Sequence, residues 1–241
     1  MKIAILAGGL GTRLSEYTST IPKPMVKIGK YPILIHIINL YLKNDLKDFY
    51  ILAGYKSHII KKYFKNFKKI NTPFKFRLKN KDCLITIIDS GKLSMTGGRL
   101  KKMMNFLKDD EKFMFTYGDG ISNISIKKLL KFHKKNKKMI TVTTVRPPAR
   151  FGEIKIKKNI VTSFKEKPQA SSSWINGGFF IANREFLKSI KNEKTILEKE
   201  PLENAAKKKQ LLAYKHKGFW KCMDTLRDKL VLEDLHKKNF F

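Results

Sequence analysis

Short apolar runs alternate with amphipathic helical patterns along most of this 241-residue chain. Short apolar runs bounded by turn residues are typical of buried strands, and apolar residues three and four positions apart are typical of helices. The alternation predicts βαβ units, and therefore an α/β fold with a Rossmann-like mixed, mostly parallel sheet flanked by helices. A chain of this length suits one domain with its own core.

The alternation is clearest up to residue 145. There we expect strands at 2–7, 49–53, 84–89, 112–117 and 139–145, and helices at 32–43, 57–67, 99–107 and 126–135. Beyond Pro147-Pro148 we expect shorter strands at 153–156, 161–165, 175–182 and 211–214, and helices at 184–190, 201–208 and 226–237. We predict a single domain, 1–241, in which a first half (about 1–145) and a small β-rich second half (about 146–241) share one sheet.

The net charge of +32 at pH 7 would suit a nucleic-acid-binding protein. However, the basic residues are nearly all lysines, dispersed along predicted exposed helix faces such as 60–65. Nucleic-acid surfaces favour arginine, which makes bidentate and stacking contacts. We therefore interpret the charge as a solvated basic surface and expect no specific nucleic acid partner.

Composition narrows the compartment and the kind of site. No apolar run is long enough to cross a bilayer, and the run at 3–7 is too short for a secretory signal. Cys83 and Cys222 are the only cysteines, so we predict no disulfide framework and a reducing, cytoplasmic location. The five histidines lack metal-ligand spacing. A cytoplasmic enzyme or binding protein without a membrane partner is expected.

A glycine-rich segment follows the first predicted strand. It reads Leu6, Ala7, Gly8, Gly9, Leu10, Gly11, Thr12 and Arg13. Glycines let a backbone approach phosphate oxygens and offer them N–H groups, and an arginine adds a permanent charge. Leu14 stands where a dinucleotide fingerprint has Gly or Ala, and no Gly-Lys-Ser/Thr of a Walker loop follows. The alternative is a plain strand-to-helix turn, which would not require three glycines and Thr-Arg.

Ten residues later, Lys23 lies between Pro22 and Pro24. Both prolines disfavour helix, so we expect an extended segment that aims the ammonium at a fixed point. An ammonium is a compact partner for phosphate. A lysine between prolines, taken alone, is more often a solvated loop residue; beside the glycine loop it is interpreted as a phosphate clamp.

The glycine loop with Thr-Arg and the following lysine resemble the signature of the nucleotidyltransferases that activate sugar 1-phosphates. Further segments similar to this family follow in order at 94–100, 115–120, 150–152, 166–168, 176–180 and 223–228. The set is most similar to the CDP-glucose-forming branch, and the resemblance covers nearly the whole chain. The chain departs from it at 68–84, which is shorter, and at its short C-terminus.

The resemblance implies transfer of a cytidylyl group from CTP to glucose 1-phosphate, with Mg²⁺ as cofactor, and assembly as a homo-oligomer. It implies that nucleotide binding involves the glycine loop with Lys23, Ser94, Arg99 and Gly118. It implies that the sugar phosphate is bound by Glu166, Lys167, Asn176, Gly177 and Gly178. Arg13, Lys23 and Lys167 carry the catalytic charges, whereas Phe179, Phe180 and Trp220 are expected to be core residues.

Two aspartates complete the predicted site. Asp119 follows a predicted strand, where ligands bind in open α/β sheets, and Asp224 lies far away in a turn. Mg²⁺ prefers one or two carboxylates together with phosphate oxygens, so the pair is a plausible metal site. For Asp224 the alternative is a helix cap, because a helical run follows it.

The predicted chemistry needs no general base, because a sugar phosphate is already a dianionic nucleophile near pH 7. Three other interpretations stay open. The base or the sugar can differ within the same reaction, the chain can be a sensing module that binds without turnover, or its charge can serve nucleic acid binding.

Overall fold

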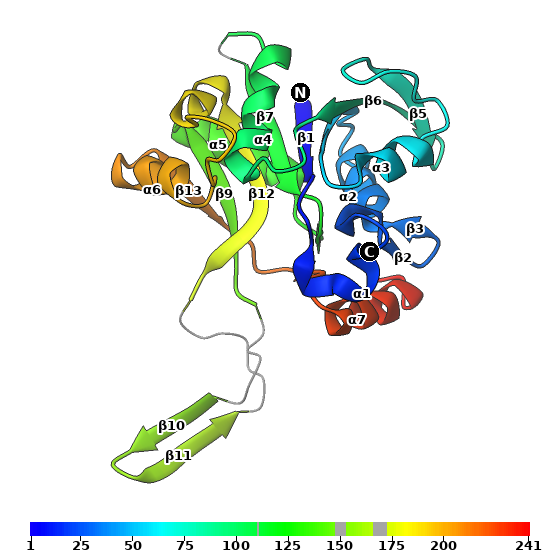
Figure 1. The fold of residues 1–241 in the computed structure, drawn as a ribbon. Coiled ribbons are helices and arrows are strands. Elements are labelled where there is room, and N and C mark those ends of the chain that lie inside the picture. Colours follow the sequence, from blue (N-terminus) through cyan, green and yellow to red (C-terminus); the bar gives the residue numbers. More distant parts are fainter. Residues whose placement is uncertain (110, 148–152, 166–172) are drawn as a thin grey trace.

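The structure is a computed structural model that describes residues 1–109, 111–147, 153–165 and 173–241. An eight-stranded sheet runs in the order β13-β9-β12-β7-β1-β4-β6-β5 (Figure 1). Its strands are β1 (Lys2–Ala7), β4 (Asp48–Ala53), β5 (Phe74–Leu78), β6 (Lys81–Asp89), β7 (Lys112–Tyr117), β9 (Ile140–Val145), β12 (Ile175–Asn183) and β13 (Leu211–Lys215). Only β5 and β12 run antiparallel to their neighbours in this sheet. The predicted α/β class with a mixed, mostly parallel sheet is confirmed.

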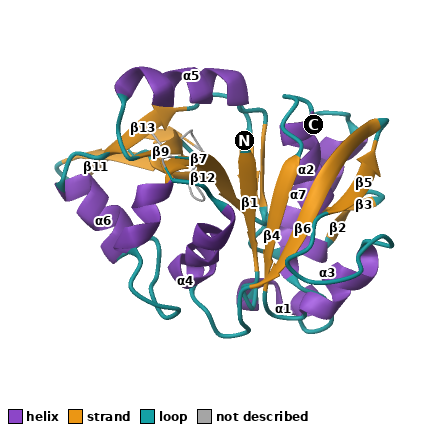
Figure 2. Cartoon of the chain, turned by 90° about the horizontal axis from the view of Figure 1, so that it is seen from above, coloured by secondary structure: helices purple, strands orange, loops and turns teal. Residues whose placement is uncertain are grey.

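Helices cover both faces of the sheet (Figure 2). They are α1 (Ser15–Thr18), α2 (Ile33–Leu42), α3 (Ser57–Tyr63), α4 (Thr96–Lys101), α5 (Ile126–Asn136), α6 (Glu200–Lys207) and α7 (Leu226–Lys237). Along β1, Ile3 and Ile5 belong to a core with α2, α3, α5 and α7, whereas Ala4 and Leu6 belong to a core with α4 and α6. Alternate side chains of a strand point to opposite faces, so a strand buried on both faces reads as one apolar run.

Three two-stranded pieces accompany the main sheet. They pair β2 (Lys27–Ile28) with β3 (Tyr31–Pro32), β8 (Gly120–Ser122) with β14 (Trp220–Cys222), and β10 (Glu153–Lys157) with β11 (Ile160–Lys165). The described part of the chain also has 3-10 helices at Thr12–Leu14, Lys23–Met25, Lys102–Phe106 and Arg184–Ser189. None of the helices in this part is long and apolar enough to cross a membrane.

The predicted elements are present, and their ends differ where tertiary packing decides. The helix predicted at 57–67 ends at Tyr63, because Phe64 is extended and packs against Phe74 and Phe76 of β5. Strand β5 itself was not predicted, although its apolar residues alternate along Phe74–Leu78. The helix predicted at 99–107 begins at Thr96 and tightens into the 3-10 helix at Lys102. The predicted helix at 184–190 is also a 3-10 helix.

The strand directions gather several loops at one edge of the sheet. The parallel strands β1, β4, β6 and β7 all end there, and β12, antiparallel to β7, begins there. In open α/β sheets the carboxyl ends of the strands are the usual place for ligands. This edge therefore carries the glycine loop, the Gly118-Asp119 turn and the Asn176-Gly177-Gly178 segment together.

Candidate active site

The glycine loop leaves β1 and turns directly into the first 3-10 helix. Gly11 has φ of 68°, the left-handed region that favours glycine, and a Cβ there would lie 2.8 Å from Thr18 Cγ2. The Thr18 hydroxyl contacts the carbonyls of Gly11 and Leu14, both at 3.0 Å. The backbone N–H of Tyr55 donates to the Gly8 carbonyl at 3.1 Å. Both ends of the loop are thus held by the fold, while Gly9 between them is exposed.

Lys23 lies in a tight turn, which corrects part of the prediction. Pro22 is extended, as expected, but Lys23–Met25 is a 3-10 helix in which the Met25 N–H donates to Pro22 O at 2.8 Å. A proline fits the first turn of a helix, where its missing N–H is not needed, so Pro24 does not keep the segment extended. A Cβ on Gly118 would lie 2.8 Å from Pro24 Cγ, so the turn packs closely over that glycine.

A short strand pair brings the two aspartates together. Asp119 precedes β8 and Asp224 follows β14, and these strands pair antiparallel with Cys222 opposite Gly120. The N–H of Met223 extends the pairing by donating to Asp119 O at 2.9 Å. Residues more than a hundred positions apart therefore reach the same point, which is the geometry that the predicted metal pair requires.

Asp224 is not the cap of the helix that follows it. Thr225 caps α7: its Oγ accepts from the Asp228 N–H at 3.2 Å, and Asp228 Oδ2 accepts from the Thr225 N–H at 3.0 Å. This is a reciprocal capping box. The alternative role considered for Asp224 is thus filled by its neighbours, and its carboxylate is free to face the site.

Lys23 joins the two carboxylates. Its Nζ donates to Asp119 Oδ2 and to Asp224 Oδ1, both at 2.6 Å, with only 12% of the lysine side chain exposed. Burial lowers the pKa of Lys23, but the charges and hydrogen bonds of Asp119 and Asp224 outweigh burial and hold this pKa above its usual value. Lys23 is therefore a largely buried ammonium held between the two carboxylates.

Arg13 contributes a second cation from the other side. Its Nη1 donates to Asp224 Oδ2 at 2.9 Å, while 70% of its side chain is exposed. Asp224 thus contacts a buried cation through one oxygen and an exposed cation through the other. We call Arg13, Lys23, Asp119 and Asp224 the charged cluster.

Arg99 lies behind the glycine loop. It is 4% exposed, and its guanidinium donates to Ser90 Oγ at 2.8 Å and to the carbonyls of Gly91 at 2.6 Å and Lys92 at 3.2 Å. A Cβ on Gly8 would lie 2.1 Å from Arg99 Nη1, so the guanidinium packs directly against the loop backbone. Burial lowers the pKa of Arg99, and the charge of Asp89 opposes this.

Ser94 is also buried, at 7% exposed, and its hydroxyl has no hydrogen-bond partner within the described ranges. Nucleotide binding by Ser94 and by Arg99 stays a prediction, as it does for Leu6, Ala7, Gly8, Gly9, Leu10, Gly11, Thr12 and Gly118. In the structure these residues lie in or around the glycine loop, at one edge of the sheet.

The start of β12 lies against the end of β7. Asn176 Nδ2 donates to Tyr117 Oη at 3.1 Å, and Asn176 Oδ1 accepts from the Gly178 N–H at 2.8 Å. Gly178 has φ of 79°, and a Cβ there would lie 2.7 Å from the Tyr117 ring. Trp220 Nε1 donates to Gly177 O at 2.7 Å, so this residue, expected only in the core, also braces the segment. Glu166 and Lys167 lie outside the described residues.

Comparison with known proteins decides the family. A nucleotidyl transferase family model matches residues 2–228. The glucose-1-phosphate cytidylyltransferase of Salmonella typhimurium is 46% identical over 248 residues, covering 99% of this chain and 96% of that protein. A protein of Bacillus subtilis described as a probable glucose-1-phosphate cytidylyltransferase is 35% identical, covering 98% and 96%. The chain belongs to the nucleotidyl transferase family.

Solved structures share the fold. An apo UDP-glucose pyrophosphorylase superposes with a TM-score of 0.73 at 18% identity, covering 100% of this chain and 99% of that one. A putative glucose-1-phosphate thymidylyltransferase of Bacillus anthracis gives 0.71 at 20% identity, covering 98% and 94%. The resemblance stated from the sequence is confirmed at the level of the family. The prediction that the chain is an enzyme of the nucleotidyltransferase class is confirmed as well.

Sequence reasoning did not single out Tyr117 and Glu198, which are linked to the predicted site residue Asn176 by hydrogen bonds. Tyr117 Oη donates to Glu198 Oε1 at 2.5 Å as well as accepting from Asn176. Tyr117 stands immediately before Gly118-Asp119, so its position at the end of a strand was an available signal. Glu198 lies in a loop without a recognisable motif, and no sequence pattern pointed to it.

Proposed function

We propose that this chain transfers the cytidylyl group of CTP to glucose 1-phosphate, forming CDP-glucose and releasing pyrophosphate. The observation that carries the proposal is the charged cluster, in which carboxylates from distant loops meet two cations beside a glycine loop. The choice of CTP and glucose rests on the similarity to proteins named glucose-1-phosphate cytidylyltransferases.

The charged cluster fits a divalent metal, which this family generally uses. Asp119 and Asp224 already hold one cation, the Lys23 ammonium, at 2.6 Å each. Within the described ranges no group of three or more His, Cys, Asp or Glu side chains could form an all-protein cage. Mg²⁺ is suited to such a site, because it takes one or two carboxylates and completes its shell with water and substrate phosphates. We propose Mg²⁺, held by Asp119 and Asp224; bound there, it would neutralise phosphate charge.

The chain's own residues then bind and orient the substrates. The glycine loop offers backbone N–H groups to the triphosphate, and the exposed Arg13 guanidinium adds a bidentate donor. Lys23 supplies a buried charge for the phosphates and the departing pyrophosphate. Lys167, by resemblance, aligns the sugar phosphate, and Glu166 accepts from sugar hydroxyls. Asn176, Gly177 and Gly178 let the sugar ring approach β12 closely.

Positioning and charge stabilisation are sufficient for this reaction. The second ionisation of a sugar phosphate lies near pH 6, so its oxygen is already a nucleophile at neutral pH. An in-line displacement at the α-phosphorus then needs no general base. The mechanism needs no histidine as a base, and the charged cluster as defined contains none.

Pyrophosphate release tests the proposal. The purified chain with Mg²⁺ should be assayed with CTP, UTP, dTTP and GTP against glucose 1-phosphate, mannose 1-phosphate and galactose 1-phosphate. We expect CTP with glucose 1-phosphate to give the highest kcat/KM by about 10-fold or more, a preference of at least about 1.4 kcal/mol. A higher value for another pair would reassign the substrates. Nucleotide binding without turnover of any pair would favour a sensing module.

Gly9 provides a test of the phosphate-binding loop. A Cβ added at Gly9 would meet no atom within 4 Å, so Gly9→Ala should fold with the melting temperature of the wild-type protein. A methyl group at a point of close phosphate approach should nevertheless raise the KM for CTP by about 10-fold. The matched control is Gly11→Ala, whose left-handed φ and 2.8 Å contact should lower the melting temperature. An unchanged KM in Gly9→Ala would place the phosphates elsewhere.

The resemblance also leads us to propose a homo-oligomer in the cytoplasm. Both cysteines are free in the structure, which suits a reducing compartment. Light scattering on the purified chain measures the assembly.

For the basic surface, we propose only weak, salt-sensitive binding of nucleic acid without sequence preference. Titration with DNA and RNA at physiological ionic strength checks this, and tight sequence-selective binding would add a second function.

A further inference from the structure

A chain of hydrogen bonds leads away from the predicted sugar site and ends on Glu198. Asn176 Nδ2 donates to Tyr117 Oη at 3.1 Å, and Tyr117 Oη donates to Glu198 Oε1 at 2.5 Å. The other carboxylate oxygen, Glu198 Oε2, accepts from Thr96 Oγ1 at 2.6 Å. These hydrogen bonds thus join β12, β7 and the first residue of α4 through one carboxylate. We call these four residues the Glu198 network.

The loop that carries Glu198 is docked on the start of α4. The N–H of Met95 donates to Glu193 O at 2.8 Å, and the N–H groups of Gly97 and Gly98 donate to Thr195 O at 3.0 and 3.2 Å. The first N–H groups of a helix have no partner within the helix, so these carbonyls satisfy them. Close approach requires the glycines: a Cβ on Gly98 would lie 2.3 Å from Glu193 O. The Thr-Gly-Gly segment therefore serves to seat this loop.

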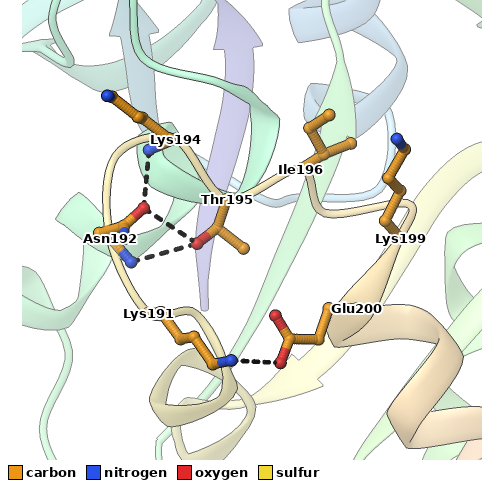
Figure 3. Close-up of a pocket in the computed structure, with 7 residues that line it drawn as sticks. All are labelled: Lys191, Asn192, Lys194, Thr195, Ile196, Lys199 and Glu200. Atoms are coloured by element: carbon orange, nitrogen blue, oxygen red, sulfur yellow. Dashed lines mark hydrogen bonds and ion pairs between the residues drawn. The ribbon is translucent and has the colours of Figure 1, made fainter.

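The same loop is closed by its own side chains (Figure 3). Asn192 Oδ1 accepts from the Lys194 N–H at 3.0 Å, and the Asn192 N–H donates to Thr195 Oγ1 at 3.1 Å. Lys191 forms an ion pair with Glu200 at 2.6 Å across a pocket of about 300 Å³. The backbone that presents Glu198 is therefore shaped by contacts that do not involve Glu198 itself.

The polarity of the network fixes the orientation of Asn176. A carboxylate only accepts hydrogen bonds, so the Tyr117 hydroxyl must donate to Glu198 and is left to accept from Asn176. Burial, followed by the charge of Glu198, raises the pKa of Tyr117, so the phenol keeps its proton. Asn176 must then point Nδ2 at Tyr117 and Oδ1 at the Gly178 N–H. Asn176 and Glu198 are exposed, so hydrogen bonds, and not burial, favour this one orientation of the amide and the phenol.

We propose that Glu198 is a positioning residue, which acts through Tyr117 to fix Asn176 for binding of the sugar 1-phosphate. The inference rests on the proposed function in one respect, namely that Asn176 contacts the sugar. Glu198 touches neither substrate in this scheme. Its effect is to remove the alternative hydrogen-bond arrangement of the Tyr117–Asn176 pair, so that the sugar meets a prepared site.

Steady-state kinetics of Glu198→Gln test the proposal. A glutamine can donate as well as accept, so the phenol proton is no longer forced toward residue 198. We expect kcat/KM for the sugar phosphate to fall by about 10- to 100-fold, with the KM for CTP changing less than about 3-fold. Because Glu198 is exposed, the variant should fold. The control is Glu200→Gln at the first residue of α6, two positions further on, which loses the ion pair with Lys191 and should keep wild-type kinetics.

A double-mutant cycle separates positioning from general support of the loop. Tyr117→Phe already breaks the Glu198 network, because phenylalanine has no hydroxyl. In that background Glu198→Gln should lower kcat/KM for the sugar phosphate by less than about a further 2-fold. Two outcomes would overturn the proposal. One is a double variant whose decrease in kcat/KM equals the product of the two single decreases. The other is a rise in the KM for CTP as large as the rise in the KM for the sugar phosphate.

Nuclear magnetic resonance separates failure of this inference from failure of the proposed reaction. The side-chain amide signal of Asn176, assigned by its loss in Asn176→Asp, should shift in Glu198→Gln and not in Glu200→Gln. This measurement needs no substrate, so it reads the network whichever nucleotide and sugar the enzyme uses. An Asn176 signal that ignores Glu198→Gln would contradict the inference even if CDP-glucose is formed.

Discussion

Asp224→Asn should lower kcat/KM by about 10³-fold or more under saturating Mg²⁺. One oxygen of Asp224 accepts from Lys23 at 2.6 Å and the other from Arg13 at 2.9 Å, so its charge holds both cations of the cluster in place. The asparagine keeps the shape of the side chain and removes the charge. Loss of a ligand in metal-assisted chemistry costs several kcal/mol, and each tenfold change in rate corresponds to about 1.4 kcal/mol.

The measurement is a steady-state assay of pyrophosphate release at increasing Mg²⁺ concentration. Chelation should abolish turnover of the wild-type protein, and Asp119→Asn should behave as Asp224→Asn does. Asp234→Asn is the control, because this carboxylate lies on α7 away from the cluster and pairs with Lys238 at 2.7 Å. It should change stability by less than about 1 kcal/mol and keep its turnover. Full activity of Asp224→Asn without added metal would remove the aspartates from the mechanism.

Local signals were enough to predict the scaffold of the site. The apolar runs at 2–7 and 112–117 are the observed bounds of β1 and β7, because each strand is buried on both faces and ends at a glycine turn. Since both strands run parallel, their loops had to meet at one edge, and Arg13 and Asp119 follow from that rule.

The convergence of Asp224 on this edge could not be predicted in the same way. It depends on the pairing of β8 with β14, each three residues long, and so short a strand shows no periodicity. The sequence also left Asp224 ambiguous, because an aspartate before a helical run resembles a cap. Only the positions of Thr225 and Asp228 decide the matter, since they form the cap themselves.

The partners of Lys23 and Tyr117 were beyond the sequence for another reason. Both residues lie in recognisable motifs, but a motif shows which residues are adjacent in the sequence and not which residues are in contact in the folded protein. Lys23 is predicted to meet phosphate, and its motif gave no sign that it also contacts both aspartates. Tyr117 has its carboxylate partner 81 positions away, in a loop whose backbone is shaped by α4.

Lys23→Met should have opposite effects on turnover and on the stabilisation that Mg²⁺ provides. Methionine fills most of the volume of the largely buried lysine stem but leaves Asp119 and Asp224 without the ammonium between them. Loss of a charge that stabilises the transition state should reduce kcat by about 10²- to 10³-fold. Removing one partner of a buried ionic cluster costs about 3 kcal/mol, so in EDTA the melting temperature should fall by about 6 to 12 °C.

Mg²⁺ should then rescue the stability of Lys23→Met but not its turnover. A divalent cation between the same carboxylates replaces the lost charge, and a ligand that binds only the folded protein stabilises it in proportion to its affinity. The rise in melting temperature on adding Mg²⁺ should therefore be larger in the variant than in the wild-type protein. Lys229→Met is the control, because this lysine is similarly buried (13% exposed) but pairs with Glu233 and lies over the Tyr17 ring, away from the cluster. It should show no such rescue and should retain turnover. A Lys23→Met protein that Mg²⁺ fails to stabilise would show that the two carboxylates do not form the metal site.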